Sequence, residues 1–210
     1  MLKILGKIPK KVSIALSGGV DSMVALDFAR KGGADVTALY VNHVTSFGQE
    51  SEVFLRDWCY KNSVNLILGK IDSAPSKGSS IEEFWRKKRY EFLEKATSDQ
   101  IITAHHIGDV METWLFSSLN GNPKVIPYSR GPFIRPFLLC DKEQIVDWAT
   151  RKGLQWMEDP SNKDTNFTRN YIRHNLMPHA LAVNPGLKKV MRKKVIAEFR
   201  DISLETQCQI

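Results

Sequence analysis

The sequence predicts an α/β fold, a Rossmann-like parallel sheet with helices on both faces, followed by a short helical C-terminal extension. Short apolar segments at 12–16, 37–41, 64–68 and 100–104 alternate with segments of helical periodicity. Such alternation requires crossover connections, which place parallel strands between two layers of helices. The 210 residues, 42% of them hydrophobic and 25% charged, suffice to bury a core of this kind.

The first strand is expected at 12–16, because an apolar run there stops at a Ser-Gly-Gly turn. A helix at 21–30 follows, where apolar residues have helical spacing and Gly32-Gly33 end the segment. The same criteria predict helices at 50–61, 81–96, 109–119 and 142–152, and helical structure from residue 170 to the C-terminus. Between them we expect a mobile loop at 71–80, irregular structure at 120–132, a last extended segment at 133–138 and a polar stretch at 158–168.

Cysteine usage and hydropathy exclude several classes of protein. Cys59, Cys140 and Cys208 are far apart and form no CxxC pair, which argues against disulfides, a structural zinc site and an iron–sulfur cluster. This usage favours a reducing, cytoplasmic location. We find no signal peptide at the N-terminus and no apolar run approaching the roughly 20 residues of a membrane span.

The formal net charge of +7 suggests a polyanionic partner, since clustered Lys and Arg attract nucleic acid or acidic substrates. Charge alone is weak evidence, because many basic proteins bind no polyanion. The oligomeric state, including a homodimer, stays open.

A phosphate-binding motif lies between the first strand and its helix: Ser17-Gly18-Gly19-Val20-Asp21-Ser22. The glycines let an anion approach the backbone, and the helix start supplies free N–H groups. Asp21 is suited to hold Mg²⁺ against phosphates. The alternative is an ordinary strand-to-helix turn with an N-cap. The motif is neither GxxxxGK[ST] nor GxGxxG, which excludes the common NTPase and dinucleotide patterns.

A second motif, at 104–113, again lies where a strand ends and a helix begins. In a parallel sheet this is the edge that carries the glycine turn, so both motifs are expected to face one crevice. Asp109 and Glu112 are three residues apart and share a helix face, and two carboxylates on an open face suit a cationic ligand. The alternative is a solvated acidic edge, and His106 is expected to be structural.

SGGVDS resembles the PP-loop of the ATP pyrophosphatases. With the second motif it resembles the tRNA(Ile)-lysidine synthetase family, whose corresponding motif is AHHxDDQxET. Later elements of that family follow in order: IE…R..RY at 81–90, RP at 135–136, ED.SN at 158–162 and RNxIR at 169–173. The resemblance covers roughly residues 12–185. It implies a PP-loop ATPase catalytic domain at 1–185 and a basic helical tail at 186–210.

The resemblance implies a specific reaction. Members of this family use ATP and Mg²⁺ to adenylate the C2 oxygen of the wobble cytidine in the CAU anticodon of an isoleucine tRNA. The ε-amine of free L-lysine then displaces AMP and forms lysidine.

The resemblance also implies roles for residues of this chain. Ser17, Gly18, Gly19, Asp21 and Ser22 would bind ATP, with Asp21 as the metal ligand. Asp21, His105 and Arg86 would be catalytic, and Asp109 and Glu112 would bind lysine. Which of His105, Asp21 or another carboxylate is the general base stays open. The expected tRNA-binding residues are Arg169, Arg173, Lys188, Lys189, Arg192 and Lys193.

Several features depart from the family pattern or allow another interpretation. Gly108 and Val110 replace the family's Asp and Gln, and the chain ends soon after the catalytic motifs. The basic residues at 188–194 are also consistent with a solvated helix face, and Arg169 and Arg173 with ion pairs to Glu158, Asp159 or Asp164. Two other functions stay open: another PP-loop ATPase, or a degenerate relative that binds tRNA without turnover.

Overall fold

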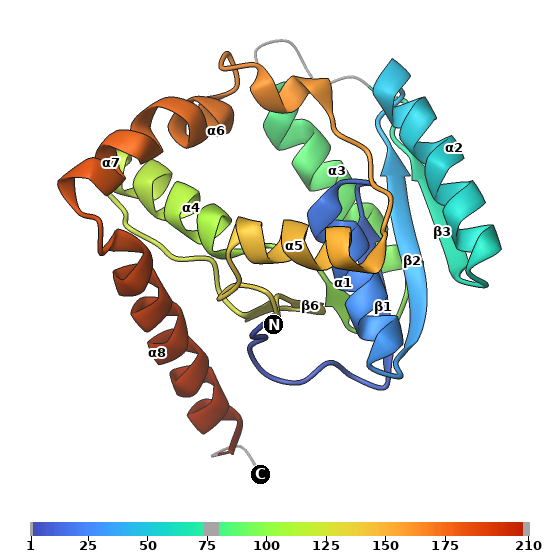
Figure 1. Cartoon of the computed structure of the whole chain (residues 1–210), viewed down its shortest axis with the longest axis horizontal. Coiled ribbons are helices and arrows are strands. Elements are labelled where there is room, and N and C mark those ends of the chain that lie inside the picture. Colours follow the sequence, from blue (N-terminus) through green and yellow to red (C-terminus); the bar gives the residue numbers. More distant parts are fainter. Residues whose placement is uncertain (1, 74–79, 208–210) are drawn as a thin grey trace.

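The computed structural model describes residues 2–73 and 80–207. Its centre is a sheet with the strand order β3-β2-β1-β4-β6-β5 (Figure 1). The strands are β1 (Lys11–Leu16), β2 (Asp35–Asn42), β3 (Asn65–Lys70), β4 (Ile101–Ile102), β5 (Ser129–Arg130) and β6 (Phe133–Ile134). The pairs from β3 to β6 are parallel, and β5 is antiparallel to β6. The predicted α/β class and the helical C-terminal part are confirmed.

Helices connect the strands and continue beyond the sheet. They are α1 (Val20–Lys31), α2 (Ser46–Lys61), α3 (Ile81–Ala96), α4 (Ile107–Leu119), α5 (Lys142–Lys152), α6 (Thr168–Tyr171), α7 (Met177–Val183) and α8 (Leu187–Gln207). A short 3-10 helix, η1 (Pro160–Lys163), precedes α6, and a π-helical turn, η2 (Ile172–Leu176), separates α6 from α7.

Both faces of the sheet are covered, as the apolar runs of the strands predict. Tyr40 of β2 packs in the cluster that α1, α2 and α5 form on one face. Its neighbour Leu39 lies with α3, β4 and β6 in the cluster on the other face. Successive strand residues point to opposite faces, so this division follows from the period of two in a strand.

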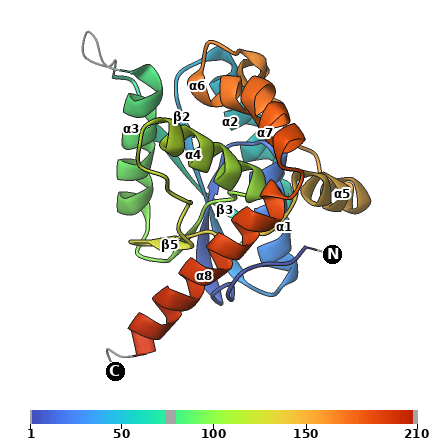
Figure 2. The ribbon, with the colours of Figure 1, turned by 90° about the vertical axis from the view of Figure 1, so that its left-hand side faces the viewer.

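The last helix belongs to a third cluster and packs against α4. Leu187, Met191 and Val195 of α8 are at most 5% exposed and lie with Val110 and Met111 of α4. Figure 2 shows this helix crossing the face of the molecule that is turned towards the viewer, next to α4. The boundary predicted at residue 185 falls between α7 and α8. The division into two domains stays a prediction.

The structure corrects several predicted boundaries. Residues 120–132, expected to be irregular, contain β5, so the sheet is mixed and not wholly parallel. Only Phe133–Ile134 of the segment 133–138 pairs as a strand. The helix expected at 50–61 begins at Ser46, because the Thr45 side chain accepts a hydrogen bond from the N–H of Gly48. The helical structure expected from residue 170 consists of α6, η2, α7 and α8, and residues 184–186 separate α7 from α8.

Some expectations lie partly outside the described residues. The loop predicted at 71–80 includes residues 74–79, and Cys208 also falls outside. Cys59 and Cys140 are both buried and unpaired. Within residues 2–73 and 80–207, no helix combines the length and apolar character that crossing a bilayer requires. The cytoplasmic location stays a prediction.

We expect Met191→Ala to lower the free energy of unfolding by about 2–5 kcal/mol, because it leaves a cavity between α8 and α4. Urea denaturation monitored by circular dichroism measures this change. Lys189→Ala, at an exposed position of the same helix, is the matched control and should change the stability little. Equal midpoints for the two variants would contradict the packing of α8 on the core.

Candidate active site

The two sequence motifs meet at the carboxyl edge of the sheet, as expected. β1 pairs with β4 in parallel, with Ser13 opposite Ile101 and Ile14 opposite Ile102. The loops that follow these strands therefore lie side by side. A cavity of about 170 Å³ is lined by Ser17, Asp21 and Ser22 of the first loop and by Thr103, Ala104 and His105 of the second.

The glycine loop is held open by its own hydrogen bonds. Gly18 has φ +81°, a backbone conformation that residues with a side chain rarely adopt, so glycine is required there. The Ser22 hydroxyl donates to the Gly19 carbonyl at 2.9 Å, and the N–H of Ser17 donates to the Ser22 oxygen at 3.2 Å. Gly19 is the N-cap residue of α1. The first N–H groups of α1 thus face this loop, which suits an anion.

Asp21, in the first turn of α1, is paired with a lysine that the sequence did not indicate. Both carboxylate oxygens of Asp21 accept hydrogen bonds from the Lys142 ammonium, at 2.8 and 2.7 Å. Lys142 is the first residue of α5, and 121 positions separate it from Asp21. No local sequence pattern predicts this contact, because it arises from the packing of α1 against α5.

His106 caps α4 and has the structural role expected of it. Its Nδ1 accepts a hydrogen bond from the N–H of Gly108 at 2.9 Å, and Asp109 Oδ2 accepts one from the N–H of His106 at 2.8 Å. The imidazole lies against Gly108, where an added Cβ would come within 2.6 Å of its Cε1. Gly108, which replaces the family's aspartate, therefore leaves room for the His106 ring in this cap.

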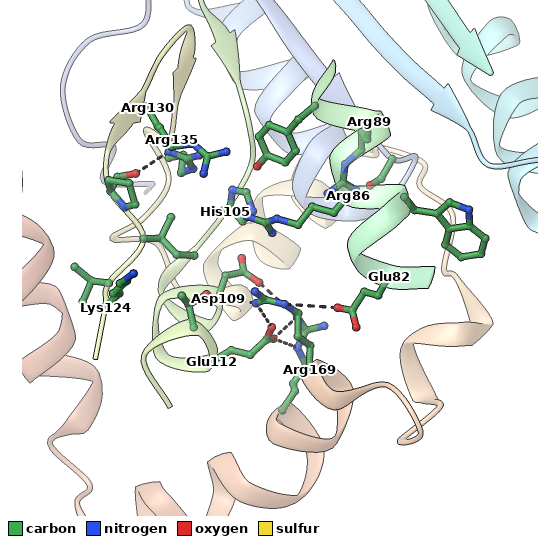
Figure 3. A pocket seen from close by; sticks show the side chains of 18 of the residues that line it. Glu82, Arg86, Arg89, His105, Asp109, Glu112, Lys124, Arg130, Arg135 and Arg169 are labelled. Carbon is green, nitrogen blue, oxygen red and sulfur yellow. Dashed lines mark hydrogen bonds and ion pairs between the residues drawn. The ribbon is translucent and has the colours of Figure 1, made fainter. Parts of the chain in front are cut away.

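The predicted open acidic face is closed at Glu112. This residue is only 2% exposed, and its carboxylate accepts hydrogen bonds from Arg169 at 2.9 Å and from Arg173 at 2.7 and 3.1 Å (Figure 3). Arg173 also lies 3.4 Å from Asp109, and Arg169 lies 3.6 Å from Glu82. The ion pairs proposed with Glu158, Asp159 or Asp164 are wrong, since the arginines face α3 and α4 instead.

A cavity of about 660 Å³, called here the main cavity, has a strongly cationic wall. Figure 3 shows Arg86 and Arg89 on α3, and Arg130 and Arg135 at the hairpin of β5 and β6. The guanidinium groups of Arg86, Arg89 and Arg130 lie 5.3, 5.9 and 5.4 Å from the centre of the Tyr90 ring. Among the described residues, no carboxylate forms an ion pair with these four arginines or with Lys124 of the same wall. Of the four, the sequence indicated only Arg86 as functional.

His105 lies in the same wall and is held neutral. Burial lowers its pKa to about 4, and the nearby guanidinium groups of Arg135, Arg89 and Arg86 act in the same direction against the opposing effect of Asp109. Its Nδ1 is 3.0 Å from the Thr103 hydroxyl. The ring is therefore uncharged at neutral pH and can accept a hydrogen bond or a proton.

The predicted tRNA-binding residues of α8 divide into two groups. Lys188 forms an ion pair with Asp141 at 2.8 Å, and Arg192 also pairs with Asp141. Because Asp141 is the N-cap residue of α5, this pair of contacts ties α8 to the helix that carries Lys142. Lys189 and Lys193 are exposed and lie four positions apart on the same helix.

Comparisons with known proteins show the family to which this chain belongs. The family model of the PP-loop domain matches residues 2–180. The chain is 33% identical over 195 residues to a tRNA(Ile)-lysidine synthase of Persephonella marina, covering 85% of this chain and 43% of that protein. The enzyme of the same name from Lactiplantibacillus plantarum is also 33% identical, with coverage of 85% and 44%. The chain thus spans about half the length of these curated relatives.

A solved structure supports the fold. The NH3-dependent NAD synthetase from Campylobacter jejuni superposes with a TM-score of 0.54 and 16% sequence identity, covering 93% of this chain and 84% of that one.

We expect the His105 imidazole to titrate near pH 4, below the ordinary value of 6.5. Imidazole chemical shifts measured by NMR between pH 3 and pH 8 test this. Arg86→Gln removes one nearby cation and should raise the pKa of His105, because it removes repulsion against the protonated ring. Lys87→Gln, on the exposed side of the same helix, is the control. A midpoint near 6.5 in the unaltered protein would contradict a buried, cation-surrounded ring.

Proposed function

Since the chain belongs to the PP-loop domain family, we propose that it ligates free lysine to C2 of the wobble cytidine in the CAU anticodon of an isoleucine tRNA, with ATP as the activating substrate. The observation that carries this proposal is the meeting of the glycine loop with His105, Asp109 and Glu112 beside one cationic cavity. ATP use is a property of the family. The acceptor RNA and the amino acid are inferred from the name of the relatives, tRNA(Ile)-lysidine synthase, and from the family resemblance.

The glycine loop is suited to the phosphates of ATP. Ser17 and Ser22 offer hydroxyl groups, Gly18 and Gly19 leave the backbone accessible, and the start of α1 is electropositive. Asp21 is the proposed metal ligand, and one carboxylate combined with substrate phosphates is a donor set typical of Mg²⁺. Bound Mg²⁺ would neutralise charge on the phosphates. Lys142, now paired with Asp21, is positioned to contact the same phosphates once its partner engages the metal.

Adenylation divides a difficult substitution into two easier steps, because the exocyclic oxygen of cytidine is a poor leaving group until AMP is attached to it. Negative charge accumulates where the phosphate, the cytidine and the leaving pyrophosphate meet. Arg86, with Arg89 beside it in the cavity wall, supplies positive charge there. Neither arginine forms an ion pair with a carboxylate of the described residues.

Lysine binding is proposed at Asp109 and Glu112. Glu112 is paired with two arginines at 2.9 and 2.7 Å, whereas Asp109 contacts only Arg173 of these, at 3.4 Å. Asp109 is therefore the carboxylate better able to receive an ammonium group. Asp109 also borders a third cavity, of about 300 Å³. The apolar side chains of Met111, Met177 and Leu181 in that cavity would fit an aliphatic chain.

The attacking amine must lose a proton, because free lysine enters with an ammonium group of pKa about 10.4. A neutral His105 can accept a proton, although a pKa of about 4 makes it a weak base in the absence of ligands. Phosphate groups bound near it would offset the surrounding arginines and raise its pKa. Asp21 and the carboxylates of α4 stay as alternatives.

Incorporation of labelled lysine into an isoleucine tRNA transcript with a CAU anticodon, with ATP and Mg²⁺, tests the function directly. We expect incorporation with this transcript and none with elongator methionine tRNA. Asp21→Ala should reduce turnover by at least about 100-fold, because it removes the proposed metal ligand. Asp57→Ala, an exposed acid of α2, is the matched control and should have no effect.

The other outcomes identify the alternatives. Release of AMP stimulated by tRNA, without lysine incorporation, would indicate a different PP-loop ATPase. Neither signal would indicate a binding protein without turnover. Normal turnover of Asp21→Ala would contradict the proposed role of the glycine loop.

The basic face of α8 is proposed to contact tRNA phosphates. Lys189→Gln combined with Lys193→Gln should weaken tRNA binding and reduce the salt dependence of the association constant, since each lost phosphate contact lowers the slope by roughly one. Filter binding at several salt concentrations measures both quantities. Lys31→Gln combined with Lys61→Gln, on helices α1 and α2, is the control with equal charge. Identical slopes for the two double variants would indicate a plain surface helix.

A further inference from the structure

An aromatic pair in the wall of the main cavity has no part in the chemistry described so far. The rings of His43 and Trp85 lie 5.3 Å apart between centroids, at an interplanar angle of 42°. Both residues are half-buried and line the cavity together with Ser17 of the glycine loop. The chain has five tryptophans, and Trp85 is the one that belongs to none of the apolar clusters of the described residues. Core packing therefore does not account for its position.

The backbone fixes His43 at this place. Asn42, the last residue of β2, accepts a hydrogen bond from the N–H of Val44 at 2.7 Å and donates one to Glu52 of α2 at 2.8 Å. Val44 has φ +59°, a conformation that is costly for a β-branched residue. The loop is thus held in a strained turn by a buried side chain, and the turn presents His43 to Trp85.

The electrostatic surroundings suit a flat, uncharged ring with an anion attached to it. Burial and the nearby Arg89 lower the pKa of His43, so its ring is neutral at pH 7. Its Nδ1 is buried and has no hydrogen-bond partner among the described residues. Arg86 follows Trp85 directly on α3, and Arg89 lies one turn further along the same cavity wall. Aromatic rings next to unpaired cations are the combination that binds bases and phosphates of nucleotides.

We propose that His43 and Trp85 form a stacking subsite for a nucleobase, either the adenine of ATP or a base of the acceptor RNA, whose phosphates contact Arg86 and Arg89. The proposal rests on the proposed function only in requiring that a nucleotide enters the main cavity. The cavity volume of about 660 Å³ lies in the range of sites that hold such ligands. A purely apolar ligand would leave the adjacent guanidinium groups without a counter-charge.

Tryptophan fluorescence tests this directly. The unaltered protein and Trp85→Phe are titrated with Mg-ATP, and separately with an RNA hairpin that carries a CAU loop. The signal of Trp85 is the difference between the two proteins. We expect a nucleotide ligand to quench this difference signal. Inorganic tripolyphosphate with Mg²⁺, which has no base, should leave it unchanged.

Affinities measured by calorimetry identify which base is bound. Trp85→Ala should weaken binding of that ligand roughly 10-fold, which corresponds to about 1.4 kcal/mol and lies within the range for base–aromatic stacking. Trp85→Phe and His43→Phe, which keep an aromatic ring, should each retain most of the affinity of the unaltered protein. Tyr60→Ala, at an aromatic residue of α2 that is 87% exposed, is the matched control. The thermal midpoint of each variant verifies that it is folded.

A loss confined to Mg-ATP would assign the subsite to adenine, and a loss confined to the hairpin would assign it to an RNA base. Equal affinities of Trp85→Ala and the unaltered protein for both ligands would overturn the proposal, even with normal lysine incorporation. Quenching of Trp85 without any lysine incorporation would reject the proposed function and leave the subsite standing. Absence of binding by both ligands would overturn both proposals.

Discussion

The site depends on one buried ionic contact, the carboxylate of Glu112 between Arg169 and Arg173. A carboxylate that is 2% exposed is stable only when its charge is matched, because taking an ion out of water costs several kcal/mol. The two arginines come from positions 57 and 61 residues further along the chain. They bring α6 and the π-helical turn against α4, and so close one wall of the main cavity. Without that carboxylate, Arg169 and Arg173 would keep only their longer contacts with Glu82 and Asp109, at 3.6 and 3.4 Å.

Much of the fold could be predicted because its signals are local. The apolar runs of β1 and β2 and the glycine turn at 18–19 can be recognised from consecutive residues. The parallel arrangement of the strands follows from the helices between them. β5 could not be predicted, since a two-residue strand has no periodicity and depends on its partner β6. The contact between Lys142 and Asp21 was equally hidden. Like the closure of Glu112, it joins segments whose proximity the tertiary fold alone decides.

Charge illustrates the same limit. The net charge of +7 indicates a polyanionic partner but gives no location for it. In the structure, part of the positive charge is internal, since Lys188 and Arg192 hold the N-cap residue Asp141. Another part is concentrated around Tyr90, where three guanidinium groups lie within 6 Å of one ring. Like charges gathered in this way repel one another, and a bound anion would relieve that repulsion. The positions of these arginines in the sequence do not show that their guanidinium groups gather around one ring.

The cap at the start of α4 also limits how this chain can change. The ring of His106 fills the space where a side chain at position 108 would begin, so the two positions are not independent. An aspartate at position 108 would displace the His106 ring from its capping position. This would destabilise α4, whatever the new carboxylate could bind. Replacing His106 first would remove the obstacle, although the helix would lose its cap meanwhile. The two substitutions are therefore expected to be non-additive, and each is harmful in the absence of the other. A change from Gly108 to aspartate at the end of β4 therefore passes through a single variant that is less stable than this chain.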